Sequence, residues 1–314
     1  MVQENRLNSE QKKKIIVVCG PTASGKSALA VKIALKFGGE IVSADSVSVY
    51  KGLDIGSAKP SEEEKKGVPH YLIDVASPKD SFSVGDYEEL AVPAVEDISG
   101  RGKIPIICGG TGFYVNSVLY SMSYGLSKGD IGIRRKYEHT AEEKGREFVY
   151  SILKEKDPET AAKLHPNDLV RVIRALEIFD ATGVKKSDIK DEMVPRYDFI
   201  ALMPTLPREI LYERINARVD NMMSCGLTSE VRSLLESGVT LEDQCMQGIG
   251  YKETAEAILS GTEIPTEQIK MNTRRYAKRQ ITFFKRFQNL YPIDFTNDDK
   301  SEKTFKIIDN FLNS

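Results

Sequence analysis

One stretch near the start of the chain constrains its fold most strongly. Residues 15–19 are apolar and β-prone and predict a buried strand, and a helix-forming run follows at 28–34. The residues between them fit the pattern G-x-x-x-x-G-K-[ST] and read Gly20-Pro21-Thr22-Ala23-Ser24-Gly25-Lys26-Ser27. In such a loop, backbone N–H groups and the helix N-terminus attract phosphate oxygens, Lys26 adds a positive charge, and Ser27 can hold Mg²⁺. The stretch therefore predicts a P-loop for a di- or triphosphate; the alternative is a glycine-rich turn that binds nothing.

The composition sets broad limits. With 314 residues, 40% of them hydrophobic and 29% charged, the chain is long enough for one large or two ordinary globular domains. It has no apolar run of membrane-spanning length, and residues 1–14 lack a signal-peptide core, so we expect a soluble cytoplasmic protein. The four cysteines form no C-x-x-C pair and are expected to be reduced. Because the net charge is −2, a nucleic-acid partner would need a local basic patch.

Two further strands are predicted to end close to the P-loop. Residues 40–44 predict a strand that ends at Asp45, and another strand leads into the glycine-rich residues 109–112. Because ligands bind at the carboxyl ends of parallel strands, we expect Asp45 on the same edge of the sheet as Lys26. There the carboxylate could hold a metal through water or accept a proton, or it could only cap a turn. The glycine-rich turn could bring Thr111 to the ligand, or it could serve close packing alone.

The chain changes character at about residue 125. Residues 68–75 and 197–203 predict strands, whereas the span 125–195 is rich in charge and helix formers and predicts a helical insertion. Beyond Pro207 we expect helices to the end of the chain. The predicted fold is α/β, a P-loop core with a mainly parallel sheet. The predicted domains are the first part of the core at 1–124, the insertion at 125–195, and the completed core with C-terminal basic helices at 196–314.

Basic residues gather in two predicted helices. In the insertion, Arg171 and Arg174 emerge near each other and could contact phosphates or simply be solvated. Near the C-terminus, residues 270–287 contain seven Lys or Arg and no acid. On a helix, Arg275 and Arg279 share one face, which we interpret as a nucleic-acid track rather than a solvated surface. The aromatic residues of this segment share another face and are predicted to be core: Tyr276, Phe283 and Phe287.

The chain resembles the tRNA dimethylallyltransferases, also called tRNA isopentenyltransferases. The resemblance covers nearly the whole chain as a series of ordered blocks. These are Gly20 to Ser27, Asp45-Ser46, Val49-Tyr50, Gly52 to Pro60, Val68 to His70, Leu72 to Asp74, Gly109 to Gly112, His165 to Asp168, Arg171 with Arg174 to Glu177, Ala217 to Asp220, Ile249 to Glu253 and Ala277 to Gln280.

This resemblance implies transfer of a dimethylallyl group from dimethylallyl diphosphate to N6 of adenosine 37 beside the tRNA anticodon, with Mg²⁺. It implies an insertion that clasps the anticodon stem-loop, and we expect a monomer that does not bind membranes. The family's general base falls on Asp45, its diphosphate site on Gly20 to Ser27, and its metal ligand on Ser27. Substrate contacts assigned to the catalytic site fall on Thr111 and Arg134. The implied tRNA contacts fall on Ser46, Val47, Ser48, Arg171, Arg174, Gly248, Gly250, Tyr251, Lys252, Arg275, Lys278, Arg279, Gln280 and Lys285.

Three positions depart from the family pattern. The family usually has Gln at Ser48, Gln at Val170 and Trp at Phe283. Ser48 and Val170 cannot make amide contacts, so base recognition near them is expected to differ. The alternatives left open are prenylation of free AMP or ADP, a P-loop kinase for a small metabolite, and a non-catalytic RNA-binding protein gated by a nucleotide.

Overall fold

The computed structural model describes residues 12–121, 130–189, 193–287, 289–294 and 299–314. Contacts divide the chain into two compact units, and each is described by itself. The first unit comprises Met1–Phe82, Asp86–Leu119 and Arg196–Ser314, and the second comprises Ser83–Gly85 and Tyr120–Pro195. The second unit runs from Tyr120 to Pro195 where the sequence analysis put the insertion at 125–195.

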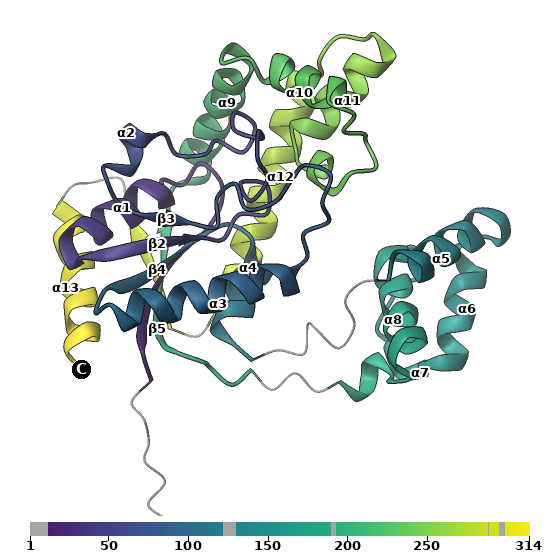
Figure 1. Cartoon of the computed structure of the whole chain (residues 1–314), viewed down its shortest axis with the longest axis horizontal. Helices are drawn as coiled ribbons and strands as arrows, with labels where there is room; N and C mark the ends of the chain where they lie inside the picture. Colours follow the sequence, from purple (N-terminus) through teal and green to yellow (C-terminus); the bar gives the residue numbers. More distant parts are fainter. Residues whose placement is uncertain (1–11, 122–129, 190–192, 288, 295–298) are drawn as a thin grey trace, which may run out of the picture. The chain divides into compact units, whose positions relative to one another are not determined.

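The first unit is built on a parallel sheet, which confirms the predicted α/β class. Within the described residues the sheet has six strands in the order β3-β2-β4-β1-β5-β6 (Figure 1). The strands are β1 (Lys14–Cys19), β2 (Gly39–Ser43), β3 (His70–Tyr71), β4 (Ile104–Gly109), β5 (Asp198–Thr205) and β6 (Leu290–Asp294).

Strand β1 lies inside the sheet because its residues are apolar on both faces. Ile15 to Cys19 are fully buried, as is typical of a parallel strand covered on two sides. On one face, Ile16 and Val18 pack with Leu29 of α1 (Lys26–Phe37) and Ile308 of α13 (Asp299–Asn313). Helices α3 (Val84–Gly100) and α4 (Gly112–Leu119) bury further side chains in this unit, including the stacked rings of Tyr87 and Tyr114.

The remaining helices of the first unit come mostly after β5. They are α2 (Glu62–Lys65), α9 (Arg208–Ser224), α10 (Leu227–Glu236), a 3₁₀ turn η2 (Gln244–Gln247), α11 (Tyr251–Ser260) and α12 (Thr266–Phe284). Helices α9 and α12 pack through Leu211, Ile215 and Ala277, so that α12 runs beside the P-loop.

Two predictions about strands are wrong. The strand predicted at 68–75 is only His70–Tyr71, because Leu72 and Asp74 adopt positive φ of 62° and 59° and turn the chain. The chain beyond Pro207 is not helical throughout, since β6 pairs with β5. Strand β6 is hard to detect because Ile293 is its only buried residue and Pro292 interrupts its pattern.

The second unit is helical, as expected for the insertion, and has a core of its own. Its helices are α5 (Ile131–Lys144), α6 (Arg146–Lys156), α7 (Pro158–Ala162), α8 (Leu169–Thr182) and a 3₁₀ turn η1 (Lys186–Asp188). Val149, Leu153, Val172 and Leu176 are fully buried and pack together. None of the helices in the described parts of the chain combines the length and hydropathy needed to cross a lipid bilayer.

Candidate active site

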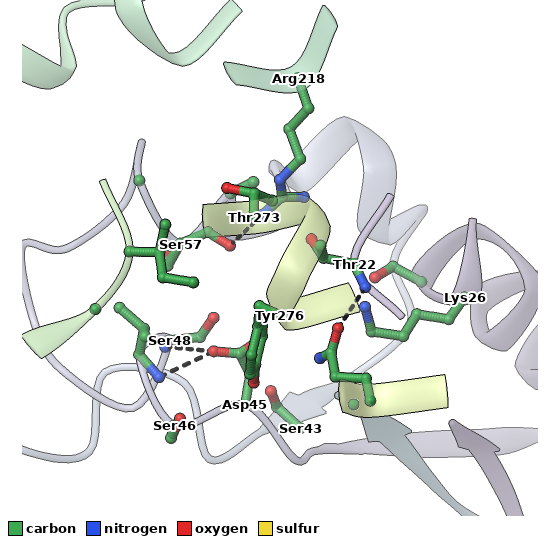
Figure 2. Close-up of a pocket in the computed structure, with 18 of the residues that line it drawn as sticks. Thr22, Lys26, Ser43, Asp45, Ser46, Ser48, Ser57, Arg218, Thr273 and Tyr276 are labelled. Carbon is green, nitrogen blue, oxygen red and sulfur yellow. Dashed lines mark hydrogen bonds between the residues drawn. The ribbon is translucent and has the colours of Figure 1, made fainter. Parts of the chain in front are cut away.

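A cavity of about 430 Å³ opens in the first unit where β1, β2 and β4 end (Figure 2). Its walls come from the P-loop, the turn after β2, helix α9 and helix α12. The residues that carry the argument below are Thr22, Lys26, Ser27, Asp45, Arg218 and Tyr276. Ligands of open α/β sheets bind at this edge, as the sequence analysis expected.

Lys26 supplies the first cation of the cavity. It opens helix α1, whose first-turn N–H groups have no partner within the helix, and its ammonium donates to the carbonyl oxygen of Pro21 at 3.4 Å. Burial lowers the pKa of the Lys26 ammonium and nearby Arg218 lowers it further, while Asp45 acts in the opposite direction. A phosphate anion bound here would therefore stabilise the charged form of Lys26.

Asp45 follows β2 and is held by its own turn. Its Oδ1 accepts hydrogen bonds from the backbone N–H groups of Val47 at 2.9 Å and Ser48 at 3.1 Å (Figure 2). No group in the described part of the chain donates to Oδ2. The two interpretations of Asp45 are therefore compatible: one oxygen fixes the turn, and the side chain still lines the cavity with the other oxygen available.

Thr111 supports this turn and does not line the cavity. Its N–H donates to the carbonyl oxygen of Ala44 at 3.1 Å, and its Oγ1 accepts from the N–H of Ser46 at 3.0 Å. Thr111 therefore positions the turn that carries Asp45, and its predicted contact with substrate stays a prediction.

Helices α9 and α12 each contribute a polar side chain to the cavity, Arg218 from α9 and Tyr276 from α12. The guanidinium of Arg218 points into the cavity and donates to the carbonyl oxygen of Ser57 at 3.0 Å (Figure 2). Burial lowers the pKa of Arg218, and Asp45 acts in the opposite direction. Tyr276 lies beside Asp45, and burial together with that carboxylate raises the pKa of Tyr276 to about 12. At neutral pH the phenol is therefore protonated and can donate a hydrogen bond.

Gln280 of α12 connects the two glycine-rich turns. Its Oε1 accepts from the N–H of Thr22 at 2.9 Å, and its Nε2 donates to the carbonyl oxygen of Gly110 at 3.0 Å. A Cβ at Gly110 would lie 2.2 Å from that amide nitrogen, so only glycine allows the contact. Gln280 is buried and both of its amide groups are bonded, so it is a structural link at the P-loop, and its predicted contact with tRNA stays a prediction.

Ser27 is the residue predicted to hold Mg²⁺. Its side chain is exposed to the cavity next to Lys26. Among the described residues, no three His, Cys, Asp or Glu side chains gather as a metal cage. Because Mg²⁺ commonly takes one or two protein ligands and completes its shell with water and phosphate oxygens, the P-loop hydroxyl fits an ion that arrives with a diphosphate.

The cavity gathers part of the predicted site. The predicted residues that line it are Thr22, Lys26, Ser27, Asp45, Ser46, Val47, Ser48, Gly248, Arg279 and Gln280. Pro21, Ser24 and Lys285 line a second, smaller cavity of about 250 Å³. The predicted residues of this unit that line neither cavity are Gly20, Ala23, Gly25, Thr111, Gly250, Tyr251, Lys252, Arg275 and Lys278.

Tyr251 and Gly250, two of the predicted tRNA contacts, are buried in the protein. Tyr251 is fully buried, and its hydroxyl donates to Oε1 of Glu230 at 2.6 Å. Glu230 also accepts N–H groups of the loop at 54–56, so the tyrosine belongs to the support of the cavity wall. Gly250 is buried and caps the start of α11, whereas Lys252 is exposed.

Three predicted arginines lie in the second unit and are described there alone. Arg174 donates to Oε2 of Glu177 at 2.9 Å, and Arg134 donates to the same oxygen at 3.4 Å. Glu177 is fully buried, so one carboxylate holds two guanidinium groups. Arg171 is exposed and pairs with Asp168 at 3.3 Å.

The basic face predicted on α12 is exposed. Arg275, Lys278, Arg279 and Lys285 all lie at the surface, and Arg279 also contacts the Tyr276 ring. Two other cations of the segment are bound within the protein: Lys270 by Asp220 at 2.7 Å and Arg274 by Asn216 at 2.6 Å. The exposed cations are therefore the ones available to a polyanion.

Sequence reasoning missed several residues of the cavity. Arg218, Ser57 and Thr273 had no assigned role, and Tyr276 was assigned to the core. The sequence pattern could have indicated Arg218, because this residue falls between Ile215 and Met222 on the buried face of α9. A cation on an otherwise apolar helix face indicates a functional or paired group.

Comparisons with known proteins agree with this geometry. A model of the IPP transferase family matches residues 48–287. The chain is 44% identical over 303 residues to the tRNA dimethylallyltransferase of Acetivibrio thermocellus, covering 95% of this chain and 97% of that protein. It is 43% identical over 312 residues to the tRNA dimethylallyltransferase of Bacillus cytotoxicus, covering 98% of each.

Solved structures give the same result. The tRNA isopentenylpyrophosphate transferase of Bacillus halodurans superposes with a TM-score of 0.71 at 38% identity, covering 96% of this chain and 97% of that one. A eukaryotic dimethylallyltransferase, described as acting on tRNA, superposes with a TM-score of 0.82 at 31% identity, covering 96% of this chain and 80% of that one. Family match, identity and fold agree over most of the length, and the chain therefore belongs to the IPP transferase family, that of the tRNA dimethylallyltransferases.

Proposed function

We propose that this protein transfers a dimethylallyl group from dimethylallyl diphosphate to N6 of adenosine 37 in tRNA, next to the anticodon. The observation that carries the proposal is the shared cavity, in which the P-loop cation Lys26 and the carboxylate of Asp45 line the same space. The ammonium of Lys26 can stabilise the leaving diphosphate, and the carboxylate of Asp45 can accept a proton from the attacking amine.

The nucleophile needs help because the lone pair of N6 is delocalised into the adenine ring. Removing a proton from N6 as the new C–N bond forms lowers the barrier. Oδ2 of Asp45 can accept that proton, since Oδ1 is held by Val47 and Ser48 and fixes the direction of the carboxylate. The protonated phenol of Tyr276 lies beside Asp45 and can orient the carboxylate of Asp45 by donating a hydrogen bond to it.

The leaving group gathers negative charge on its bridging oxygen as the allylic C–O bond breaks. Lys26, Arg218 and the N–H groups at the start of α1 can stabilise that charge, because they are fixed in place before the reaction. A bound Mg²⁺, held by Ser27 and phosphate oxygens, would supply further charge neutralisation at the diphosphate. The P-loop thus serves a departing diphosphate and transfers no phosphoryl group.

The RNA partner explains features that a small substrate would leave without a role. Helix α12 presents Arg275, Lys278 and Lys285 at the surface in a chain whose net charge is −2. A local track of cations binds phosphates without an overall positive charge. The reacting adenine must leave its stack, which is least costly in a single-stranded loop. We expect the enzyme to act in the cytoplasm as a monomer.

Diphosphate release tests the proposal and separates it from its rivals. Purified protein is given Mg²⁺ and dimethylallyl diphosphate with unmodified tRNA, with AMP, or with neither, and ATP replaces the donor in a fourth reaction. We expect diphosphate release with tRNA only. Diphosphate release with AMP but not with tRNA would indicate a nucleotide prenyltransferase. Conversion of ATP to ADP together with phosphorylation of an added small acceptor would indicate a kinase.

A further inference from the structure

A short loop at 54–58 forms part of the cavity wall and carries the group that holds Arg218. Gly56, Ser57 and Ala58 of this loop line the cavity. The carbonyl oxygen of Ser57 accepts the hydrogen bond from the guanidinium of Arg218 at 3.0 Å, as Figure 2 shows. The direction of this cation therefore depends on where the loop presents that carbonyl oxygen.

The backbone of this loop is strained at one residue. Ala58 has a φ of 50°, in the left-handed region that L side chains rarely adopt. Its N–H donates to the carbonyl oxygen of Ile55 at 3.1 Å, and the hydroxyl of Ser57 donates to the carbonyl oxygen of Leu53 at 2.5 Å. A strained conformation persists only where the surrounding structure holds it, so contacts from outside the loop must contribute.

Glu230 of α10 makes those contacts. Its Oε2 accepts hydrogen bonds from the N–H groups of Asp54 at 3.0 Å and Ile55 at 2.8 Å, and its Oε1 accepts one from the N–H of Gly56 at 3.3 Å. Successive N–H groups that converge in this way favour an anion. The half-buried carboxylate of Glu230 is that anion, and it holds the three residues that lead directly to Ser57.

Tyr251 fixes the carboxylate of Glu230 from α11. Its hydroxyl donates to Oε1 at 2.6 Å, and its ring is fully buried. A Cβ at Gly56 would lie 2.4 Å from Cε2 of this ring, so the tyrosine packs directly on the loop backbone. Burial and the hydrogen bond to Glu230 raise the pKa of Tyr251, so the phenol stays protonated and can donate. The carboxylate, the ring and the loop therefore form one packed group.

We propose that Glu230 is a positioning residue for Arg218 in the transfer reaction. By holding the N–H groups at 54–56, it fixes the carbonyl oxygen of Ser57, and this oxygen directs the guanidinium into the cavity. Glu230 itself does not line the cavity, so its effect on the reaction passes through the loop. The inference rests on the proposed function, in which Arg218 stabilises the leaving diphosphate.

A double-mutant cycle with Arg218→Gln tests this inference. Glu230→Gln keeps the size of the side chain but leaves one acceptor oxygen where two are used. We expect kcat/KM for dimethylallyl diphosphate to fall roughly tenfold, since a hydrogen-bonded charge is lost. In the Arg218→Gln background the same change should cost less than about twofold, because the group that it positions is already absent. Glu236→Gln, an exposed carboxylate on the same helix, is the matched control and should act as wild type.

Binding of inorganic diphosphate gives a second readout that needs no RNA. Isothermal titration calorimetry with Mg²⁺ present should show a higher Kd for Glu230→Gln, and no further rise when that change is added to Arg218→Gln. Tyr251→Phe is a milder variant that removes one of the four hydrogen bonds to Glu230 and decides the matter if Glu230→Gln does not fold. It should lower kcat/KM roughly threefold, again only when Arg218 is present.

The outcomes separate this inference from the proposed function. An equal loss with and without Arg218 would assign the effect to general stability and overturn the positioning role, and so would wild-type kinetics in Glu230→Gln. In both cases the proposed function stands, provided that wild-type protein releases diphosphate with tRNA. If wild-type protein binds diphosphate but releases none from the donor with tRNA, the proposed function fails, and the inference that rests on it fails too.

Discussion

The amide oxygen of Gln280 accepts a hydrogen bond from the backbone nitrogen of Thr22 at 2.9 Å, across 258 positions of sequence. The contact joins the last long helix of the core to the P-loop. Since Gln280 also donates to Gly110, the position of the phosphate-binding loop depends on α12. The basic helix α12 and the diphosphate site are therefore linked by the hydrogen bonds of Gln280.

A charge at Gln280 should disturb donor binding. Gln280→Glu removes the N–H group that hydrogen-bonds to the carbonyl oxygen of Gly110, and it places a carboxylate beside the diphosphate site. Leaving a buried carbonyl unsatisfied costs about 1–3 kcal/mol, so the KM for dimethylallyl diphosphate should rise roughly tenfold or more. Steady-state kinetics measure the change. Gln268→Glu, on the exposed side of α12, is the control and should leave the KM unaltered; equal effects of the two changes would refute the link.

Asp45→Asn should reduce turnover and leave RNA binding intact. The amide oxygen can still accept from Val47 and Ser48, so the turn survives while the proton acceptor is lost. Turnover should fall roughly 10²- to 10⁴-fold, the usual contribution of a general base. Single-turnover kinetics and a filter-binding Kd separate the two effects. Asp97→Asn, on the surface of α3, controls for loss of charge, and unchanged turnover in Asp45→Asn would remove Asp45 from the mechanism.

Arg218→Gln should weaken both donor binding and catalysis. It removes the half-buried second cation of the cavity and its hydrogen bond to the carbonyl oxygen of Ser57. A hydrogen bond to a charged group contributes about 1.5–3 kcal/mol, so kcat/KM for the donor should fall roughly 10- to 150-fold. Arg214→Gln lies one turn earlier on α9, at an exposed position, and should act as wild type. A loss of the same size in both variants would indicate a general effect of charge on the helix.

Neutralising the α12 face should flatten the salt dependence of tRNA binding. Each lost phosphate contact lowers the slope of log K against log salt concentration by about 0.7–0.9, so Arg275→Gln with Arg279→Gln should lower it by about 1.5. Equilibrium binding at four or more salt concentrations measures the slope. Lys36→Gln with Lys103→Gln removes the same charge at the N-terminal ends of β2 and β4, away from the cavity. An unchanged slope in the α12 variant would show that this face of the helix is exposed to solvent and does not contact tRNA phosphates.

The second unit should lose stability in acid through Asp157. Burial by itself raises the carboxyl pKa, but hydrogen bonds from Thr160 and Ser187, each 3.0 Å long, outweigh it and lower the pKa of Asp157 to about 2. Because the unfolded chain binds the proton first, this stabilisation is complete above the unfolded pKa of 3.8 and disappears as the pH falls toward 2.

Asp157→Asn should therefore lower the free energy of unfolding by about 2 kcal/mol at pH 7. Urea unfolding monitored through the second unit gives the value at each pH. The difference from wild type should narrow below about pH 4, where the carboxylate begins to protonate. Glu159→Gln changes an exposed carboxylate two residues away and should have little effect. A difference that stays constant down to pH 3 would assign the loss to packing.

The sequence predicted the parts of this molecule that depend on local pattern. The P-loop, the α/β class and the exposed basic face of α12 follow from short-range periodicity and motif, and the structure bears them out. Asp45 was placed on the correct edge because strands in a parallel sheet end together.

Long-range contacts account for what the sequence did not reveal. Gln280 reaches Thr22 and Gly110, and Tyr251 is buried against Glu230, although each belongs to a motif associated with tRNA contact. A motif shows that a residue matters but not whether it touches the ligand or supports a neighbour. Arg218 was overlooked because its role appears only when α9 packs over the cavity.

Identification of the product tests the central claim most directly. Unmodified tRNA, dimethylallyl diphosphate, Mg²⁺ and the wild-type protein are incubated, the tRNA is digested, and the nucleosides are analysed by liquid chromatography and tandem mass spectrometry. The account predicts one new nucleoside, an adenosine with a dimethylallyl group on N6, located next to the anticodon by mapping of the intact fragment and absent with Asp45→Asn. Unchanged nucleosides with wild-type protein, or a prenyl group on any other atom, would contradict it.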